Sequence, residues 1–234
     1  AEAACECLHL DCPDPDLEDW KAMIGALRHP TGNVSVALVG KYISLHDAYI
    51  SVVEALKHGG ISRHVSVSIK WVDAETVTDE NAAALLGDVD GILVPGGFGD
   101  RGIEGKISAI RYAREHRIPF LGLCLGMQLA IVEFARHIIG YTDAHSAEID
   151  PRTVHPMIDL MPDQDGVEDI GGTLRLGSYP CILDRDSLAY RLYGAEEIHE
   201  RHRHCYEVNN AYRHILEKKG MTLAGLSHDG RIVE

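Results

Sequence analysis

The sequence has 234 residues, 45% of them apolar and 25% charged, a composition typical of one globular domain with a sizeable core. Its 36 acidic and 22 basic side chains give a formal net charge of −14, which argues against a nucleic-acid polymer as partner but still allows a nucleotide held by local donors. The most apolar stretch, residues 118–135, contains Pro119, Gln128 and Glu133, so we expect no membrane span.

The first residues of the chain and its cysteine content indicate the context in which the protein works. The chain starts Ala-Glu-Ala-Ala without a basic segment or an initiator methionine, and we interpret this start as a boundary inside a longer protein. Six cysteines are too few for a disulfide framework of this length, which predicts a reduced, cytoplasmic protein. The spacing of Cys5, Cys7 and Cys12 resembles half of a metal-binding cluster, but no matching second pair follows them. A linker is therefore the favoured interpretation of this segment.

The first part of the chain predicts little regular structure. Residues 1–16 are acidic, contain proline and show no hydrophobic period. Leu17–Arg28 predicts a short amphipathic helix with Trp20, Ile24 and Leu27 on one face. We therefore expect an interdomain linker with a short helix over residues 1–33.

From Val34 onward, strand patterns alternate with helix patterns. The expected strands are 34–39, 65–72, 91–94 and 120–123. The expected helices are 47–58 (ended by Gly59-Gly60), 81–86, 104–116, 126–137 and, after shorter strand-like pieces beyond Gly140, 211–219. This alternation predicts an α/β fold over residues 34–234: a doubly wound, mostly parallel central sheet with helices on both faces. Ligands of such sheets bind at the carboxyl ends of the strands, where two loops carry unusual residues.

The first of these loops surrounds Cys124. Gly122-Leu123-Cys124-Leu125-Gly126 follows a strand and opens a helix, which is the spacing of a nucleophile elbow. Glycines flank the nucleophile because the sharp turn leaves no room for a Cβ atom. We expect the helix N-terminus to favour the thiolate of Cys124, and the N–H of Leu125 to point to where an oxyanion forms. A small buried core cysteine is the alternative interpretation.

The second loop is Pro95-Gly96-Gly97-Phe98-Gly99, at the end of the neighbouring strand. Glycine there lets a backbone N–H approach a reacting carbonyl and act as a second oxyanion donor. The alternative is a plain tight turn. The two loops together favour nucleophilic catalysis by Cys124 over either alternative.

These two loops resemble the class I (triad) glutamine amidotransferases, in which a cysteine attacks the side-chain amide of glutamine, forms a thioester and frees ammonia. Further motifs are similar to the amidotransferase domain of the CTP synthase family, and the resemblance runs from about Leu17 onward. Those motifs occupy residues 37–42, 47–49, 54–58, 101–106, 145–148, 171–177, 200–204 and 206–210.

The resemblance implies roles for individual residues. Cys124 matches the nucleophile, and Gly97 and Leu125 match the oxyanion donors. The positions that match the glutamine-binding residues are Gly97, Leu125, Gly126, Met127, Gln128 and Glu148. A lid-like segment linked to GTP activation is matched by Arg101, Gly102 and Glu104. Only the resemblance places Glu148 in the site, although a carboxylate suits an α-ammonium group.

Two departures from the family pattern stand out. The family's triad is completed by a His-Pro-Glu segment, whereas none of the 14 histidines here has a glutamate two places on. We expect the chain to stop short of that segment, and to be poorly active or inactive alone. Cys205 stands where the family usually has an arginine that binds the glutamine carboxylate, a loss of about 2–5 kcal/mol if buried.

The resemblance also implies partners. No cofactor is expected in this domain; ATP and magnesium belong to a synthetase domain of the same polypeptide that converts UTP to CTP, with GTP as an activator. The full protein is expected to be a homo-oligomer that binds no nucleic-acid polymer and no membrane. The alternatives are a non-catalytic binding module with this fold, favoured by the two departures, and another cysteine hydrolase.

Three histidines lie close together in residues 199–204, a pattern that raises the question of a metal site. The spacing of His199, His202 and His204 suits neither one helix face nor one strand face, so we expect no metal site there. A polar segment lining the site or the surface is favoured instead. Its two arginines, Arg201 and Arg203, are suited to hold a carboxylate.

Overall fold

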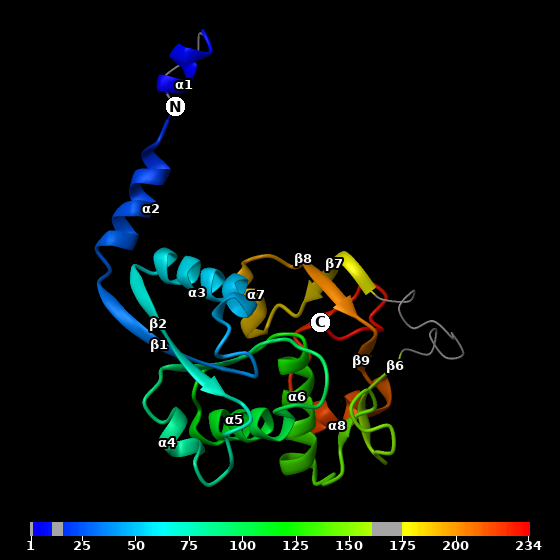
Figure 1. Ribbon diagram of the computed structural model, residues 1–234. Helices are drawn as coiled ribbons and strands as arrows, with labels where there is room; N and C mark the ends of the chain where they lie inside the picture. The colour runs from blue at the N-terminus through cyan, green and yellow to red at the C-terminus, as the bar shows by residue number, and fades with distance from the viewer. Residues whose placement is uncertain (1, 11–15, 161–174) are drawn as a thin grey trace.

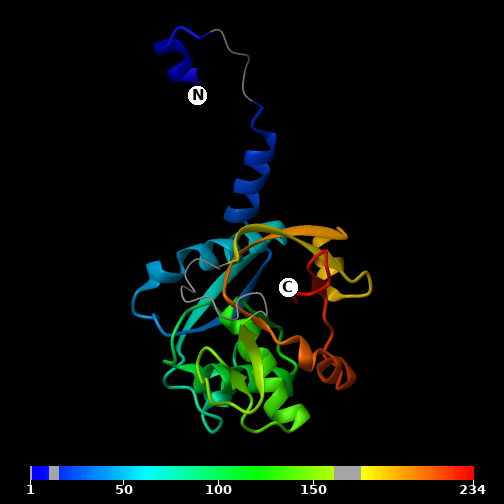
Figure 2. The ribbon, with the colours of Figure 1, turned by 90° about the vertical axis from the view of Figure 1, so that its right-hand side faces the viewer.

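The computed structural model describes residues 2–10, 16–160 and 175–234. Two helices, α1 (Glu2–Cys7) and α2 (Glu18–Arg28), extend away from the body of the molecule (Figures 1 and 2). The second confirms the helix expected at this place, whereas the first lies in a segment for which no period was expected. No residue of α2 is buried, and Trp20 is 62% exposed.

A four-stranded parallel sheet forms the centre of the fold. Its strand order is β2-β1-β3-β4, with bounds Val65–Asp73, Gly32–Gly40, Gly91–Val94 and Phe120–Gly122. The short α4 (Ala82–Leu86) follows β2 in the chain. The parallel sheet confirms the predicted α/β class.

Helices cover both faces of this sheet. Leu38 and Leu93 point toward α3 (Ile50–Ser62), in a cluster that also holds Tyr49. The alternate residues of the same strands, among them Val39 and Ile92, pack in the larger cluster with α5 (Ile103–His116) and α6 (Leu125–Phe134). The period of two along each strand therefore divides the apolar residues between two layers, as a doubly wound sheet requires.

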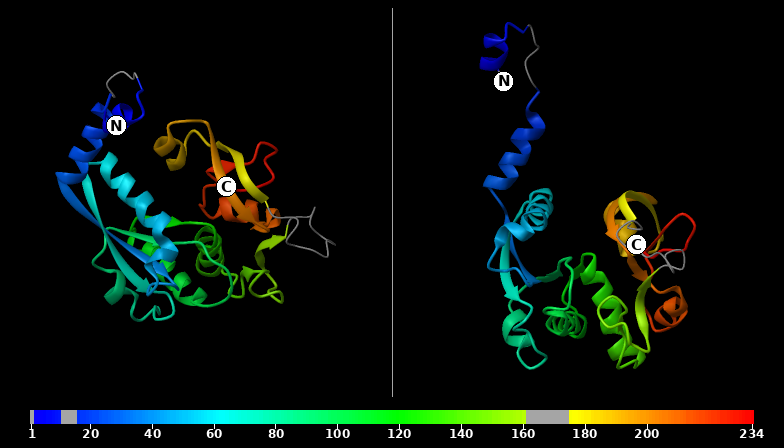
Figure 3. Two further views of the ribbon diagram at one scale, coloured as in Figure 1. Left: turned by 45° about the horizontal axis from the view of Figure 1, so that its top comes forward. Right: turned by 45° about the vertical axis from the view of Figure 1, so that its right-hand side comes forward.

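Beyond Gly140 the chain forms two small sheets. One has the order β5-β6-β9 and the other the order β10-β7-β8. Both lie on the side of α6 away from β1 and β2 (Figure 3). Their strands are β5 (His145–Ser146), β6 (Pro156–Leu160), β7 (Arg175–Leu183), β8 (Glu197–His204), β9 (Tyr206–Val208) and β10 (Gly225–Leu226), with α7 (Leu188–Tyr193) and α8 (Arg213–Lys218) beside them. Most of the motif at residues 171–177 lies outside the described residues.

The predicted end of α3 is wrong. A 3₁₀ turn, His46–Tyr49, precedes the helix, which then runs through both glycines to Ser62. Gly60 has a packing role rather than a terminating one, because a Cβ atom there would lie 2.7 Å from the carbonyl oxygen of Val65. The helix predicted over 126–137 likewise changes character, since α6 gives way to a π-helical turn over Ala135–Ile139 that ends at Gly140, where φ is +96°.

The two adjacent glycines of α3 give a matched test of this packing. Gly60→Ala places a methyl group against Val65 and Val67 and is expected to lower the free energy of unfolding by about 1–3 kcal/mol. Gly59→Ala meets nothing within 4 Å and is expected to raise it by about 0.5–1 kcal/mol. Urea unfolding of both variants measures the difference, and equal effects would contradict the close approach of α3 to β2.

Among the described residues, no helix combines the length and the apolar character that crossing a bilayer demands.

Candidate functional site

Cys124 occupies a strained turn between β4 and α6. Its φ is +55° and its ψ is −109°, a backbone conformation that residues other than glycine adopt rarely. A Cβ atom at Gly126 would lie 2.1 Å from the carbonyl oxygen of Val94, and one at Gly122 would lie 2.5 Å from the carbonyl carbon of Gly126. The turn therefore has no room for side chains at the flanking positions, as the elbow spacing predicts.

A cavity of about 130 Å³ opens beside Cys124. Four residues singled out from the sequence line it together: Cys124, Gly97, Gln128 and Glu148. They come from the end of β4, the loop after β3, helix α6 and the turn after β5. The remaining lining residues are Phe98, Arg203, His204, Cys205 and Tyr206.

Another part of the cavity lining comes from the β8–β9 segment, where the sequence predicted a polar segment lining the site or the surface, with Arg201 and Arg203 suited to hold a carboxylate. Its sequence signal was the motif pair at residues 200–204 and 206–210. The side-chain amide of Gln128 donates a hydrogen bond of 2.9 Å to the carbonyl oxygen of Tyr206. Gln128 is 5% exposed, so this bond fixes β9 against α6 and closes the cavity on that side.

Other predicted site residues do not line the cavity. Leu125 and Gly126 are buried in the first turn of α6, and Met127 packs against the main core. The backbone N–H groups of Leu125 and Gly97 nevertheless face the sulfur of Cys124, where they act to lower the pKa of its thiol. Both expected oxyanion donors are thus directed at the position of the nucleophile.

The segment matched to the GTP-linked lid lies on the loop that leads into α5, away from the cavity lining. Arg101 forms an ion pair of 3.0 Å with Glu75. Gly102, with φ of +74°, precedes the first turn of α5. Glu104 pairs with Arg136 at 2.9 Å. These contacts hold the segment to the body of the protein rather than to the residues around Cys124.

Burial raises the pKa of the Cys124 thiol, and the neighbouring carboxylates of Glu148 and Glu207 act in the same direction. The N–H groups of Leu125 and Gly97 act in the opposite direction but are weaker than burial. The helix N-terminus favours the thiolate of Cys124 as expected, but burial outweighs it and the pKa of the thiol is raised. The thiol is the resting form at neutral pH.

The raised pKa of the Cys124 thiol predicts how the rate of its alkylation depends on pH. Because the pKa of Cys124 lies above the ordinary thiol value of 9.0, the reactive thiolate gains about tenfold per pH unit from pH 7 to 9 without reaching a plateau. Iodoacetamide labelling followed by peptide mass spectrometry measures this rate at Cys124. The same peptide in the urea-unfolded chain, with an ordinary thiol pKa, is the control. A plateau below pH 8 in the folded protein would contradict the raised pKa.

A carboxylate, that of Glu148, also lines the cavity. Burial raises the pKa of Glu148, and its backbone N–H donates to the Ser146 hydroxyl at 3.3 Å. Among the described residues, no ion pair with Glu148 is formed. Glu148 is an exposed residue, and its uncompensated negative charge at the cavity favours a positively charged ligand group.

A second buried acid–base cluster lies behind the cavity. Arg175 contacts Glu207 at 3.0 Å and Glu234 at 2.5 Å, and His204 lies 3.7 Å from Glu207. Burial raises the pKa of Glu207 to about 7 and lowers that of His204. His204 is therefore neutral at pH 7 where it lines the cavity. In the part of the chain that the structure describes, no three His, Cys, Asp or Glu side chains are grouped to hold a metal ion.

The doubly wound sheet, the elbow turn at Cys124 and the two backbone N–H groups beside its sulfur are typical of α/β enzymes that use a cysteine nucleophile. Comparison with known proteins specifies the family: the model of the glutamine amidotransferase class-I family matches residues 44–234, and the chain belongs to this family.

Its relatives are similar over almost the entire chain. The CTP synthases of Geobacillus kaustophilus (strain HTA426) and Halalkalibacterium halodurans are 59% and 58% identical to it over 233 residues. These matches cover 100% of this chain and 44% of each relative, so the chain spans less than half the length of these proteins. The CTP synthase of Staphylococcus carnosus is 58% identical over 221 residues, 94% of this chain and 41% of the relative.

A solved structure has the same fold. It is the glutaminase domain of Trypanosoma brucei CTPS with bound acivicin, 37% identical, with a TM-score of 0.80. The match covers 86% of this chain and 79% of that one. Fold and family are thus those that the two loop motifs predict.

Proposed function

We propose that this chain is the glutamine-hydrolysing part of a CTP synthase, with Cys124 as the nucleophile. The observation that carries the proposal is the convergence of two backbone N–H groups, from Gly97 and Leu125, on the sulfur of Cys124. That sulfur opens into a cavity whose wall carries Glu148, a carboxylate that forms no ion pair among the described residues. Backbone donors at a nucleophile suit an oxyanion, and a carboxylate without an ion-pair partner suits the ammonium group of an amino acid.

The reaction follows from these positions. With the α-ammonium group of glutamine at Glu148, the side-chain amide reaches Cys124, whose sulfur forms a bond to the amide carbon. The carbonyl oxygen becomes negatively charged and accepts hydrogen bonds from Gly97 and Leu125. The carbon–nitrogen bond then breaks, the thiol proton leaves with ammonia, and a γ-glutamyl thioester remains. Water cleaves the thioester to give glutamate and the free thiol.

The proton transfers require a general base, because the thiol is the resting form. The family pattern assigns this role to the histidine of a His-Pro-Glu segment, supported by the glutamate, and none of the histidines in this sequence has that pattern. The residues around the cavity contribute binding and oxyanion stabilisation. Gln128 and the first turn of α6, including Gly126 and Met127, support the wall against which glutamine lies.

The ammonia is used by a synthetase domain of the same polypeptide, which converts UTP to CTP with ATP and magnesium. The length of the curated relatives, of which this chain spans 44%, supports this arrangement. Residues 1–33 act as the connection between the two domains, in keeping with helices that extend from the body (Figure 1). GTP activates the reaction through the segment of Arg101, Gly102 and Glu104, and the full protein is a cytoplasmic homo-oligomer.

The test is the release of glutamate and ammonia from glutamine by the purified chain, measured as equal amounts of both products. Asparagine is the matched control substrate, because it carries the same reacting amide and charges but is one methylene shorter. The proposal predicts release from glutamine at a rate well above that from asparagine. Because no histidine of this sequence has the family's pattern for the general base, the rate is expected to be low, and equal rates for both amides would contradict the proposal.

A further inference from the structure

One wall of the cavity carries a positive charge that no known role accounts for. Arg203 lies on β8 and lines the cavity together with Cys124 and Glu148. Among the described lining residues it bears the one guanidinium or ammonium group, since His204 beside it is held neutral by burial.

The charges of Arg203 and Glu148 are not used on each other. No ion pair or hydrogen bond joins Arg203 to a carboxylate among the described residues, and Glu148 has no cationic partner among them. The two side chains belong to separate segments, β8 and the turn after β5. One unpaired charge of each sign on one cavity is complementary to a zwitterion, such as the α-ammonium and α-carboxylate groups of an amino acid.

The neighbouring position makes such a role necessary. Cys205 also lines the cavity, and a thiol there offers no charge to a carboxylate. Glutamine bound with its ammonium group at Glu148 would leave its carboxylate without a partner unless another cation supplies one. Leaving a charged group unpaired costs several kcal/mol by the usual size of buried charge pairs, about 2–5 kcal/mol.

We propose that Arg203 binds the α-carboxylate of the substrate in this chain and, with Glu148, selects free α-amino acids. The inference rests on the proposed function and deepens it by naming the residue that recognises the carboxylate. The planar guanidinium accepts a carboxylate in a two-point contact, which a lysine at the same place does not reproduce.

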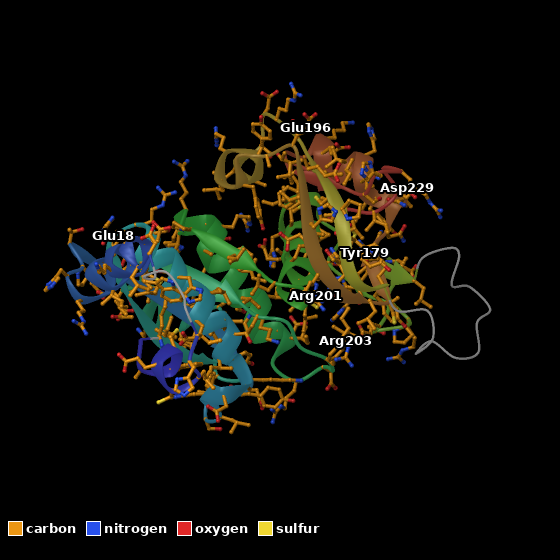
Figure 4. All side chains as sticks on the ribbon, turned by 90° about the horizontal axis from the view of Figure 1, so that it is seen from above. Glu18, Tyr179, Glu196, Arg201, Arg203 and Asp229 are labelled. Carbon is orange, nitrogen blue, oxygen red and sulfur yellow. The ribbon has the colours of Figure 1, made fainter. Side chains whose placement is uncertain are left out.

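The chain offers a matched control on the same strand. Arg201 lies two residues before Arg203, on the same face of β8, and both are exposed (Figure 4). Arg201 is not among the residues that line the cavity. A general effect of removing positive charge from β8 appears in both variants, whereas carboxylate binding requires Arg203 alone.

The experiment is labelling of Cys124 by the electrophilic glutamine analogue 6-diazo-5-oxonorleucine, quantified by mass spectrometry at increasing glutamine concentration. Compared with the wild-type chain, Arg203→Gln is expected to raise the glutamine concentration for half-protection about 10- to 100-fold. Arg201→Gln is expected to change it less than about threefold. Cys205→Arg supplies a second cation, so Arg203→Gln should have a smaller effect in the Cys205→Arg background.

Each outcome bears on the inference. Protection in the wild-type chain that Arg203→Gln leaves intact would overturn the role of Arg203 while the proposed function stands. Protection only after Cys205→Arg would show that Arg203 is insufficient, and again overturns the inference alone. If glutamine protects Cys124 in none of the chains, including Cys205→Arg, the proposed function and the inference both fail. Circular dichroism of the Arg203→Gln chain checks that its fold is kept.

Discussion

Replacement of Cys124 by alanine is expected to abolish any ammonia release from glutamine by this chain. The sulfur is the atom to which Gly97 and Leu125 direct their backbone N–H groups, and without it no thioester forms. The fold should remain, because alanine is smaller than cysteine and Cys124 is only half-buried. The measurement is glutamate production by the variant and the wild-type chain at equal concentration.

Another cysteine serves as the control. Cys181 is buried, and burial raises the pKa of its thiol to about 11, so it is neither accessible nor ionised at neutral pH. Cys181→Ala should therefore leave the rate of ammonia release within about twofold of the wild-type value, apart from its effect on stability. Retained activity in Cys124→Ala, or faster alkylation of Cys181 or Cys205 than of Cys124, would contradict the assignment of the nucleophile.

Gly126→Ala is expected to damage fold and site together. Its methyl group would lie 2.1 Å from the carbonyl oxygen of Val94 and 3.2 Å from the Val94 Cβ atom, where β3 and α6 meet. Backbone cannot yield as a flexible side chain does, so we expect a loss of about 3 kcal/mol of unfolding free energy. The displacement also moves the Leu125 N–H from the sulfur of Cys124, so protection of Cys124 by glutamine should be lost. Urea unfolding and the labelling assay measure both effects.

Gly97→Ala tests whether any alanine in a glycine-rich loop lowers the unfolding free energy, or only an alanine whose methyl group collides with backbone. A Cβ atom at Gly97 finds only the Lys41 Cε atom, at the ordinary contact distance of 3.9 Å. Its unfolding free energy should stay within about 0.5 kcal/mol of the wild-type value. Equal losses of stability in Gly97→Ala and Gly126→Ala would refute the explanation of the elbow by close packing.

The central sheet and the elbow were predictable because both depend on local signals. Each strand bears a short apolar run, and glycines mark the turn at Cys124 where any Cβ atom collides with backbone. Such signals act within a few residues, so the sequence alone predicted that Cys124, Gly97 and Leu125 lie together at the carboxyl ends of neighbouring strands.

The cavity lining from the β8–β9 segment depends on contacts between distant segments, and periodicity does not reveal those. Arg203 reaches the cavity because β8 pairs with β7 and because Gln128 holds β9 against α6, 78 residues away along the chain. The same limitation explains the end of α3, where Gly60 is needed for packing against β2 rather than for termination. It also explains the thiol of Cys124, whose pKa is decided by burial rather than by the start of the helix.

The proposed reaction requires a bond between the sulfur of Cys124 and the amide carbon of glutamine. The most direct measurement is intact-protein and peptide mass spectrometry after brief mixing with glutamine and acid quenching. The proposed reaction predicts a γ-glutamyl group on Cys124. Hydroxylamine should release this group as the hydroxamate, and Cys124→Ala should not carry it. Ammonia release without a γ-glutamyl group on Cys124, or with the group on another residue, would contradict it.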